Sequence, residues 1–181
     1  KFARYIGILG LLVALCVSFS PELAFFNQYK SMFDFNENAA LFTKISLVVT
    51  LLIFFLGGFA FNNHRSHQSE LYSLMLFSLI GAVILFSFTN LVTLFLGIEI
   101  LSIPLYVMAG SNKTDLRSNE ASIKYFLMGA FATGFLLFGI ALIYGSTGSF
   151  DVHVINTFSV ANPKDLMFVM GIMLMLVAMA F

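Results

Sequence analysis

The sequence predicts an all-α, polytopic integral membrane protein with about six transmembrane helices. Of its 181 residues, 60% are hydrophobic and 10% are charged, whereas soluble domains carry about 25% charged residues. The mean hydropathy is +0.96, and a soluble chain of this length could not cover so much apolar surface. The apolar runs are also long enough to cross a bilayer, which takes roughly 20 helical residues. We therefore expect a single transmembrane domain over residues 1–181.

Six apolar segments form the predicted transmembrane helices. They cover residues 4–20, 38–61, 69–89, 90–110, 118–144 and 165–181. The last run, LMFVMGIMLMLVAMAF, continues to the end of the sequence without a polar flank, and the sequence begins with Lys1 instead of methionine. We expect the chain to be a fragment of a longer polytopic protein, with its last span cut short.

The first segment has a second interpretation. KFAR, followed by YIGILGLLVALCVSFS and Pro21, is similar to a secretory signal peptide. However, no initiator methionine precedes it and no clear small-x-small cleavage site follows. The alternation of loops across the membrane also needs this segment as a span, so we favour a transmembrane helix.

Polar residues between the segments mark the expected helix ends. The third and fourth segments meet near Asn90 with almost no loop, which predicts a tight antiparallel hairpin. Ser118-Asn119-Glu120 is expected to cap the start of the fifth helix. Asn162-Pro163-Lys164-Asp165 offers the last helix an N-cap, a proline at the first helical position and an acid in the first turn. The stretches 21–37 and 145–164 are predicted to be polar connections.

The distribution of lysine and arginine predicts the orientation in the membrane. When alternate loops are assigned to opposite sides, five basic residues fall on the side of the N-terminus and two on the other. The first group is Lys1, Arg4, Arg65, Lys113 and Arg117, and the second is Lys30 and Lys164. This bias predicts a cytoplasmic N-terminus.

Glu99 lies near the middle of the fourth segment, in the run LVTLFLGIEILSIPLYVMAG. A charged side chain at this depth costs about 2.5–3.5 kcal/mol on insertion scales. Burial favours the neutral form of a carboxyl group, which suits it to take up and release protons. The alternative is a structural glutamate that is hydrogen-bonded to a neighbouring helix with the help of Ser102. We interpret Glu99 as a proton-pathway residue.

Lys124 is the second candidate for the proton pathway. It follows the start of the fifth segment by six residues and Glu120 by four. Glutamate followed by lysine at this spacing is a favourable helical ion pair, so the two side chains could also form a merely solvated cap. A partly buried lysine can hold or pass a proton. We expect the depths of Glu99 and Lys124 to differ by roughly 8 Å and their charges to approach within ~10 Å.

At an effective dielectric constant near 20, two charges ~10 Å apart interact with about 1.7 kcal/mol. Protonation of one group would therefore bias the other. Pro104 removes the hydrogen bond to the carbonyl of Ile100 and predicts a kink beside Glu99. Ser102, Pro104 and Glu120 are candidate supporting residues. Small residues in the fifth segment predict close helix packing. They are Ala121, Ser122, Gly129, Ala130, Thr133, Gly134 and Gly139.

The sequence contains no phosphate-binding glycine-rich loop, metal-ligand cluster or nucleophile–base arrangement. His64, His67 and His153 lie in polar connections, which argues against bis-histidine haem ligation. The single cysteine, Cys16, excludes an iron–sulfur cluster within this chain. The net charge of zero gives no indication of a nucleic-acid partner. We expect no metal, cofactor or catalytic redox site in this chain, which leaves proton or ion transport.

The run LFLGIEILSIPLYVMAG and the following SNEASIKYFLMGAFATGFLLFGIALIYGSTGS resemble the antiporter-like subunits of respiratory complex I. The resemblance is to subunit N of bacterial proton-pumping NADH:quinone oxidoreductase, the counterpart of mitochondrial NADH dehydrogenase subunit 2. It is sharpest from about Leu91 to Ser149. A glutamate and a lysine twenty-five residues apart are typical of antiporter-like subunits, and EASIKYFL indicates subunit N.

The resemblance implies a fourteen-helix fold with two inverted five-helix repeats, of which this chain would hold only part of one. It implies a translocase subunit of the bacterial inner membrane, which moves protons through buried charges and water. Glu99 would be the glutamate that modulates the proton affinity of Lys124. NADH, flavin, iron–sulfur clusters and quinone would bind to other subunits of the complex, and the partners would be the other membrane-arm subunits and the lipid bilayer.

Three alternatives share some of these features. A subunit of a multisubunit Na⁺/H⁺ antiporter or of a membrane-bound hydrogenase would carry the same charged motifs. A structural membrane scaffold would use Glu99 and Lys124 only to pair helices. An enzyme subunit that forms part of a quinone site is disfavoured because no intramembrane histidine or Tyr–His arrangement is present.

Overall fold

The computed structural model describes residues 2–19, 32–60 and 68–180. These residues form seven α-helices and no named β-strand. The helices are α1 (Phe2–Ser18), α2 (Glu37–Ala60), α3 (Gln68–Phe86), α4 (Leu91–Ala109), α5 (Leu116–Thr147), α6 (Val152–Ala161) and α7 (Leu166–Ala180). The predicted all-α fold is confirmed.

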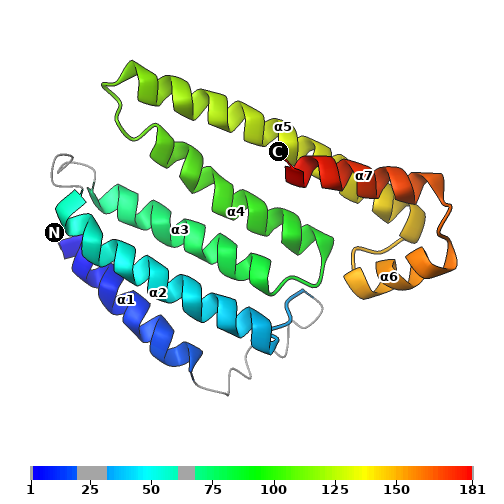
Figure 1. The fold of residues 1–181 in the computed structure, drawn as a ribbon, viewed down its shortest axis with the longest axis horizontal. Helices are drawn as coiled ribbons and strands as arrows, with labels where there is room; N and C mark the ends of the chain where they lie inside the picture. Colours follow the sequence, from blue (N-terminus) through cyan, green and yellow to red (C-terminus); the bar gives the residue numbers. More distant parts are fainter. Residues whose placement is uncertain (1, 20–31, 61–67, 181) are drawn as a thin grey trace.

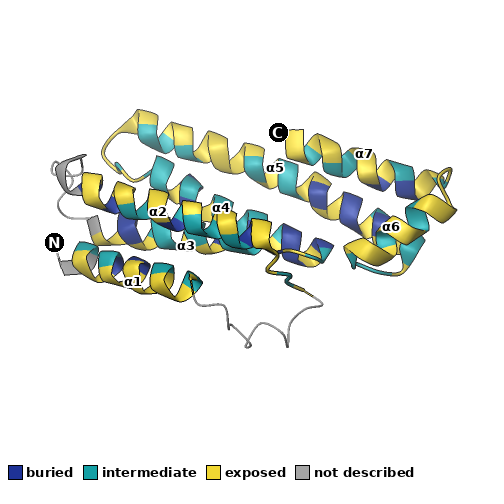
Figure 2. Ribbon diagram, turned by 60° about the horizontal axis from the view of Figure 1, so that its bottom comes forward, coloured by how far each residue is buried: buried dark blue, intermediate teal, exposed yellow. Residues whose placement is uncertain are grey.

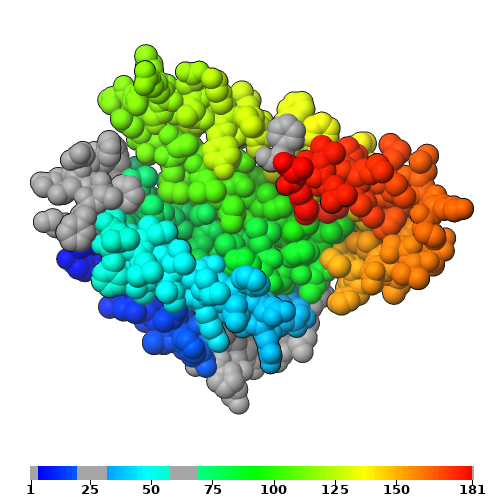
Figure 3. Space-filling model, viewed as in Figure 1, coloured from blue at the N-terminus to red at the C-terminus, as the bar shows by residue number. Residues whose placement is uncertain are grey.

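Helices α1 to α5 lie side by side as a row, and α7 packs along the second half of α5 (Figure 1). The most extensive contacts join α3 to α4 and α5 to α7. In the space-filling view, α4 (green) lies between α2 (cyan) and the first half of α5 (yellow-green) (Figure 3). The fourth helix therefore has a packed neighbour on each side, α3 and α5.

The predicted hairpin at Asn90 is present. Asn90 caps α4, because its side chain accepts a 2.8 Å hydrogen bond from the backbone N–H of Val92. The turn before it is held by two neighbouring segments. The backbone N–H of Asp34 donates to the Ser87 carbonyl at 2.7 Å, and that of Leu91 donates to the Phe150 carbonyl at 2.9 Å. The starts of α2 and α4 and the end of α5 are thus tied together at one end of the row.

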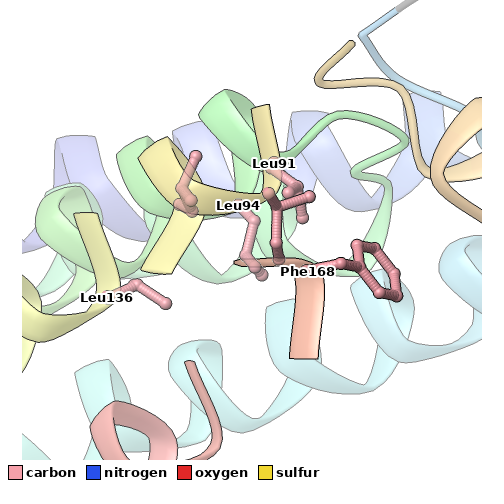
Figure 4. Close-up of a cluster of buried hydrophobic side chains, with 6 residues drawn as sticks. Leu91, Leu94, Leu136 and Phe168 are labelled. Atoms are coloured by element: carbon pink, nitrogen blue, oxygen red, sulfur yellow. The ribbon is translucent and has the colours of Figure 1, made fainter. Parts of the chain in front are cut away.

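Two apolar clusters hold the helices together. One consists of Leu91, Leu94, Leu136, Ile140, Ile143 and Phe168, and it joins α4, α5 and α7 (Figure 4). The other consists of Leu11, Leu47, Phe54 and Tyr72, and it joins α1, α2 and α3. Both clusters bridge three helices, so each contributes to the order of the row.

Glycines let some of these helices approach closely. A Cβ at Gly81 would overlap the backbone of Ile100 and Leu101 in α4. A Cβ at Gly139 would lie 2.8 Å from the carbonyl oxygen of Gly171 in α7. The small residues of α5 therefore do serve close packing at Gly139, whereas a Cβ at Gly134 meets nothing within 4 Å.

The surface of the described chain is largely apolar. Large apolar side chains are exposed on all the long helices (Figure 2). Within the described residues, four helices are long and apolar enough to cross a membrane, namely α2 to α5. Helices α1 and α7 are also apolar but have 17 and 15 residues. Such a surface suits a lipid environment.

The structure corrects three sequence-based expectations. The cap of α5 is Asp115, so that helix begins at Leu116 and not at Ser118. The backbone N–H of Phe168 donates to the Asp165 side chain, so Asp165 caps α7, whereas Asn162 ends α6. The stretch predicted as a polar connection contains α6, whose cap is Asp151.

Candidate functional site

Glu99 is the ninth residue of α4 and is half-buried. Its carboxylate makes no hydrogen bond or ion pair with any described residue. Leu96, one turn before Glu99 in α4, is 49% exposed, and Ile103, one turn after it, is 50% exposed. Glu99 therefore lies where the packed side of α4 meets its exposed side. Among the described residues, it is the only acidic side chain more than two turns from both ends of its helix.

Lys124 occupies the third turn of α5 and is bound to Glu120. Its Nζ lies 2.5 Å from Glu120 Oε1, and the two side chains are 70% and 63% exposed. The predicted (i, i+4) ion pair is thus present. The expectation of buried charges is wrong for Lys124 in this part of the chain, because its stem extends from the outer side of the helix.

Two serines of α5 fix the register between α4 and α5. Ser118 Oγ donates to the Ala109 carbonyl at 2.7 Å, and Ser122 Oγ donates to the Tyr106 carbonyl at 2.8 Å. In this antiparallel register Lys124 is level with about Pro104. Glu99 is then about five residues deeper, or roughly 7 Å along the axis at 1.5 Å per residue.

The side of α5 that faces α4 is marked by Ser118, Ser122 and Gly129, which recur at helical spacing. Lys124 follows Ser122 by two residues, so it lies about 200° around the helix. Its side chain leaves the helix away from α4. The structure therefore places Glu99 and Lys124 on neighbouring helices, roughly 7 Å apart in depth, and does not bring their charged atoms together.

The predicted supporting residues have separate roles. Helix α4 continues through Pro104, which is buried. The carbonyl of Leu101 accepts a 3.3 Å hydrogen bond from Ser78 Oγ of α3. Ser102 makes no hydrogen bond to Glu99 and instead lines a cavity between α4 and α5.

This cavity adds two residues, Tyr106 and Tyr125, that the sequence had not singled out. Its volume is about 330 Å³, and α4, α5 and the end of α7 form its wall. Two wall residues, Met128 and Met179, are more than half exposed, so the cavity is partly open to the surface of the described chain. Four hydroxyl-bearing side chains lie in its wall, from Ser102, Tyr106, Tyr125 and Thr133. The sequence signal that could have indicated it is the recurrence of Ser122, Tyr125 and Gly129 on one side of α5.

The described residues contain no group of three or more His, Cys, Asp or Glu side chains that could hold a metal ion. His153 lies exposed in α6, and Cys16 is exposed on α1. His64 and His67 lie outside the described residues.

The model of the NADH:quinone oxidoreductase/Mrp antiporter transmembrane family matches residues 88–181, just over half of the chain. The chain belongs to this family. The matched part includes Glu99, Lys124 and the cavity between α4 and α5. Within the family, the chain resembles subunit N of NADH-quinone oxidoreductase, as the sequence motifs predicted.

The relative from Cytophaga hutchinsonii, an NADH-quinone oxidoreductase subunit N, is 43% identical over 178 residues. That alignment covers 97% of this chain and 37% of the relative. The fold is also found in a chain of respiratory complex I from Thermus thermophilus with bound aureothin. That chain is 28% identical, with a TM-score of 0.70, and the match covers 98% of this chain and 38% of that one.

A further fold match is a chain of the membrane-bound sulfane sulfur reductase, an archaeal respiratory membrane complex. Its TM-score is 0.80 at 24% identity, and the match covers 98% of this chain and 38% of that one. At this identity the likeness concerns the fold alone. The chain thus spans less than two fifths of the length of these similar proteins.

Proposed function

We propose that this chain is part of a proton-translocating membrane-arm subunit of NADH:quinone oxidoreductase. The observation that carries the proposal is Glu99, a half-buried carboxyl group in α4 that has no partner among the described residues. An unpaired acid at membrane depth is costly. A role that needs a titratable group at this position would offset that cost.

In this proposal Glu99 takes up and releases protons inside the membrane, and Lys124 exchanges protons nearer the cytoplasmic end of α5. The two groups act on each other through space, since Lys124 is bound to Glu120. At a separation of ~12 Å and an effective dielectric constant of 20, their interaction is at most about 1.4 kcal/mol, and solvent reduces it further.

The remaining parts of the proposal concern the whole complex. The redox chemistry and its cofactors, namely NADH, flavin, iron–sulfur clusters and quinone, belong to other subunits, and the membrane-arm subunits are the partners. The protein is a multi-pass protein of the bacterial inner membrane with the start of this chain in the cytoplasm. The orientation depends on the lysine and arginine count, of which Lys1, Lys30 and Arg65 lie outside the described residues.

The test is proton pumping by the full-length protein in its native complex, with Glu99 changed to Gln. Loss of a positioned proton-transfer group lowers rates by about a hundredfold or more, so pumping should fall strongly while the complex stays assembled. Glu37→Gln is the matched control, because Glu37 lies exposed in the first turn of α2. Normal pumping by the Glu99→Gln complex would contradict the proposal.

A second candidate function is ion transport in an Mrp-type antiporter, because the family model covers both kinds of protein. The subunits that co-purify with the full-length protein distinguish the two. The scaffold alternative, in which Glu99 and Lys124 pair two helices, is not favoured, because Lys124 pairs within its own helix.

A further inference from the structure

An apolar groove runs between α2 and α4, with α3 as its floor, and its volume is about 410 Å³. It shares no wall residue with the cavity beside α5. Its two walls are large apolar side chains of α2 and α4, namely Ile45, Val49, Ile53, Leu101, Leu105 and Met108. The three α2 residues are 43–50% exposed, so the rim of the groove is open and apolar.

The floor of the groove is hollow because two small residues, Ser78 and Ala82, lie one turn apart on α3. Helix α2 is held on α3 by the rings of Phe54 and Tyr72, whose centroids are 4.6 Å apart. Helix α4 is held on the same helix by the close approach of Gly81 to its backbone. Neither α2 nor α4 can therefore move inward and close the groove without losing these contacts.

The hydroxyl groups in the groove are mostly satisfied within the protein. Ser78 Oγ donates to the Leu101 carbonyl at 3.3 Å, and Thr50 Oγ1 donates to the Ser46 carbonyl at 2.8 Å. No charged side chain is among the residues that line the groove. An apolar occupant leaves at most the Ser46 hydroxyl unpaired, whereas water in the groove would find too few of the two to four polar partners that it needs.

The groove is narrow. At 1.5 Å per residue, the wall residues of α2 and α4 span about 11 Å. The volume of about 410 Å³ over this length gives a cross-section of roughly 40 Å². A helix with its side chains is at least 10 Å across and has a cross-section of about 80 Å². The groove therefore does not admit a helix, but it suits a flexible hydrocarbon chain.

A cation lies beyond one end of the groove. Met108 is the second-last residue of α4, and Lys113 follows in the loop to α5, at the upper left of Figure 1. The side chain of Lys113 is exposed and forms no ion pair with a described residue. Asp115, the acid of this loop, accepts a 3.0 Å hydrogen bond from the Arg117 N–H as the cap of α5. The loop thus offers a positive charge where a membrane-spanning helix ends.

We propose that this groove binds an acyl chain of an anionic phospholipid, with Lys113 at its phosphate group. The chain supplies the dispersion contacts that the hollow above Ser78 and Ala82 lacks. One lysine near an anionic headgroup favours binding by about fivefold. Leu101 and Met108 follow Glu99 by two and nine residues, so they lie on the opposite side of α4 from it. The lipid site therefore does not depend on the proposed proton function.

The first test is photo-crosslinking of the purified native complex, which contains the full-length protein, with phosphatidylglycerol that carries a diazirine in one acyl chain. Label should appear on residues 101–108 of α4, and an excess of unlabelled phosphatidylglycerol should displace it. Label that the excess does not displace would mean contact with bulk lipid only. No label on these residues would mean that another part of the complex covers the groove. Either result would overturn the proposal.

The second test fills the groove. Ala82→Leu places a larger side chain on the floor, where it overlaps the bound chain, and the label on α4 should fall about fivefold or more. Ala121→Leu is the matched control, because Ala121 is exposed on α5 and does not line the groove. The thermal midpoint of each complex checks that the variant is folded. Unchanged labelling in a folded Ala82→Leu complex would contradict the site.

The third test concerns the headgroup and uses a surface substitution that leaves the groove intact. In the Lys113→Gln complex, the preference for phosphatidylglycerol over phosphatidylcholine should fall by about fivefold. Lys164→Gln is the control, because Lys164 is exposed in the loop between α6 and α7. If Lys113→Gln keeps the preference, the phosphate is held elsewhere and the proposal is wrong. Pumping by the Glu99→Gln complex tests the proposed function separately and does not bear on this site.

Discussion

The ammonium group of Lys124 is bound to the carboxylate of Glu120, one turn earlier on α5, at 2.5 Å. Glu99, on the neighbouring helix, has no ion-pair partner among the described residues. The two candidate pathway charges therefore differ in kind. One is exposed in this part of the chain and already neutralised by a neighbour, whereas the other is half-buried and unpaired.

Glu120→Gln should change the stability of the protein very little. Exposed (i, i+4) pairs contribute about 0.3–0.5 kcal/mol, and the exposure of both side chains places this pair at the low end. The measurement is a double-mutant cycle of Glu120→Gln and Lys124→Gln on the thermal midpoint of the purified complex, at low and high salt. A coupling well above about 1 kcal/mol would indicate that the rest of the protein buries the pair.

Gly81→Ala should destabilise the protein, because the new methyl group would overlap the backbone of α4 at Ile100 and Leu101. Overpacking of this kind costs about 1–3 kcal/mol, more than the helix propensity gained by alanine. The matched control is Gly134→Ala, since a Cβ at Gly134 meets nothing within 4 Å. The thermal midpoint of the complex should fall for Gly81→Ala and stay level or rise for Gly134→Ala. Similar effects of the two substitutions would argue against this α3–α4 contact.

The sequence predicted the features that depend on local pattern. The helical apolar runs, the hairpin at Asn90 and the Glu120–Lys124 pair all follow from spacing along one stretch of chain. The caps were partly mistaken because several polar residues compete at each helix start. Ser118 was expected to cap α5, but its hydroxyl bonds across to the Ala109 carbonyl, and Asp115 caps instead.

Features that depend on register between helices could not be predicted in this way. The cavity requires Tyr106 of α4 to lie over Gly129 of α5, and this alignment is set by the hydrogen bonds of Ser118 and Ser122. Helix α6 was missed because it has only ten residues, and His153, Asn156, Thr157 and Ser159 among them made it part of a polar connection. The direction of Lys124 likewise became clear only once the side of α5 that faces α4 was known.

Asp165→Ala should weaken the start of α7 more than Asn162→Ala does. The Asp165 side chain accepts a 2.8 Å hydrogen bond from the backbone N–H of Phe168, a member of the α4–α5–α7 cluster. Loss of such a cap costs about 1 kcal/mol. Asn162 contributes its backbone N–H to the end of α6, and alanine keeps that group. The thermal midpoint of the complex should fall further for Asp165→Ala than for Asn162→Ala. A larger fall for Asn162→Ala would favour the cap expected from the sequence.

Gly129→Ala should reduce pumping by moving the Tyr106 ring, because a Cβ at position 129 overlaps both the hydroxyl and the ring of Tyr106. The displaced ring would lose its edge contact with Tyr125 and carry its hydroxyl out of the cavity. We expect pumping to fall about two- to tenfold, because the shift disturbs the packing of α4 near Glu99. If the ring transmits the effect, Gly129→Ala should cause little further loss in a Tyr106→Ala background, where there is no ring to displace. Additive losses would instead mean that Gly129 serves close packing of α4 against α5 independently of Tyr106. Gly134→Ala is the control for alanine alone in this helix, because a Cβ at Gly134 meets nothing within 4 Å.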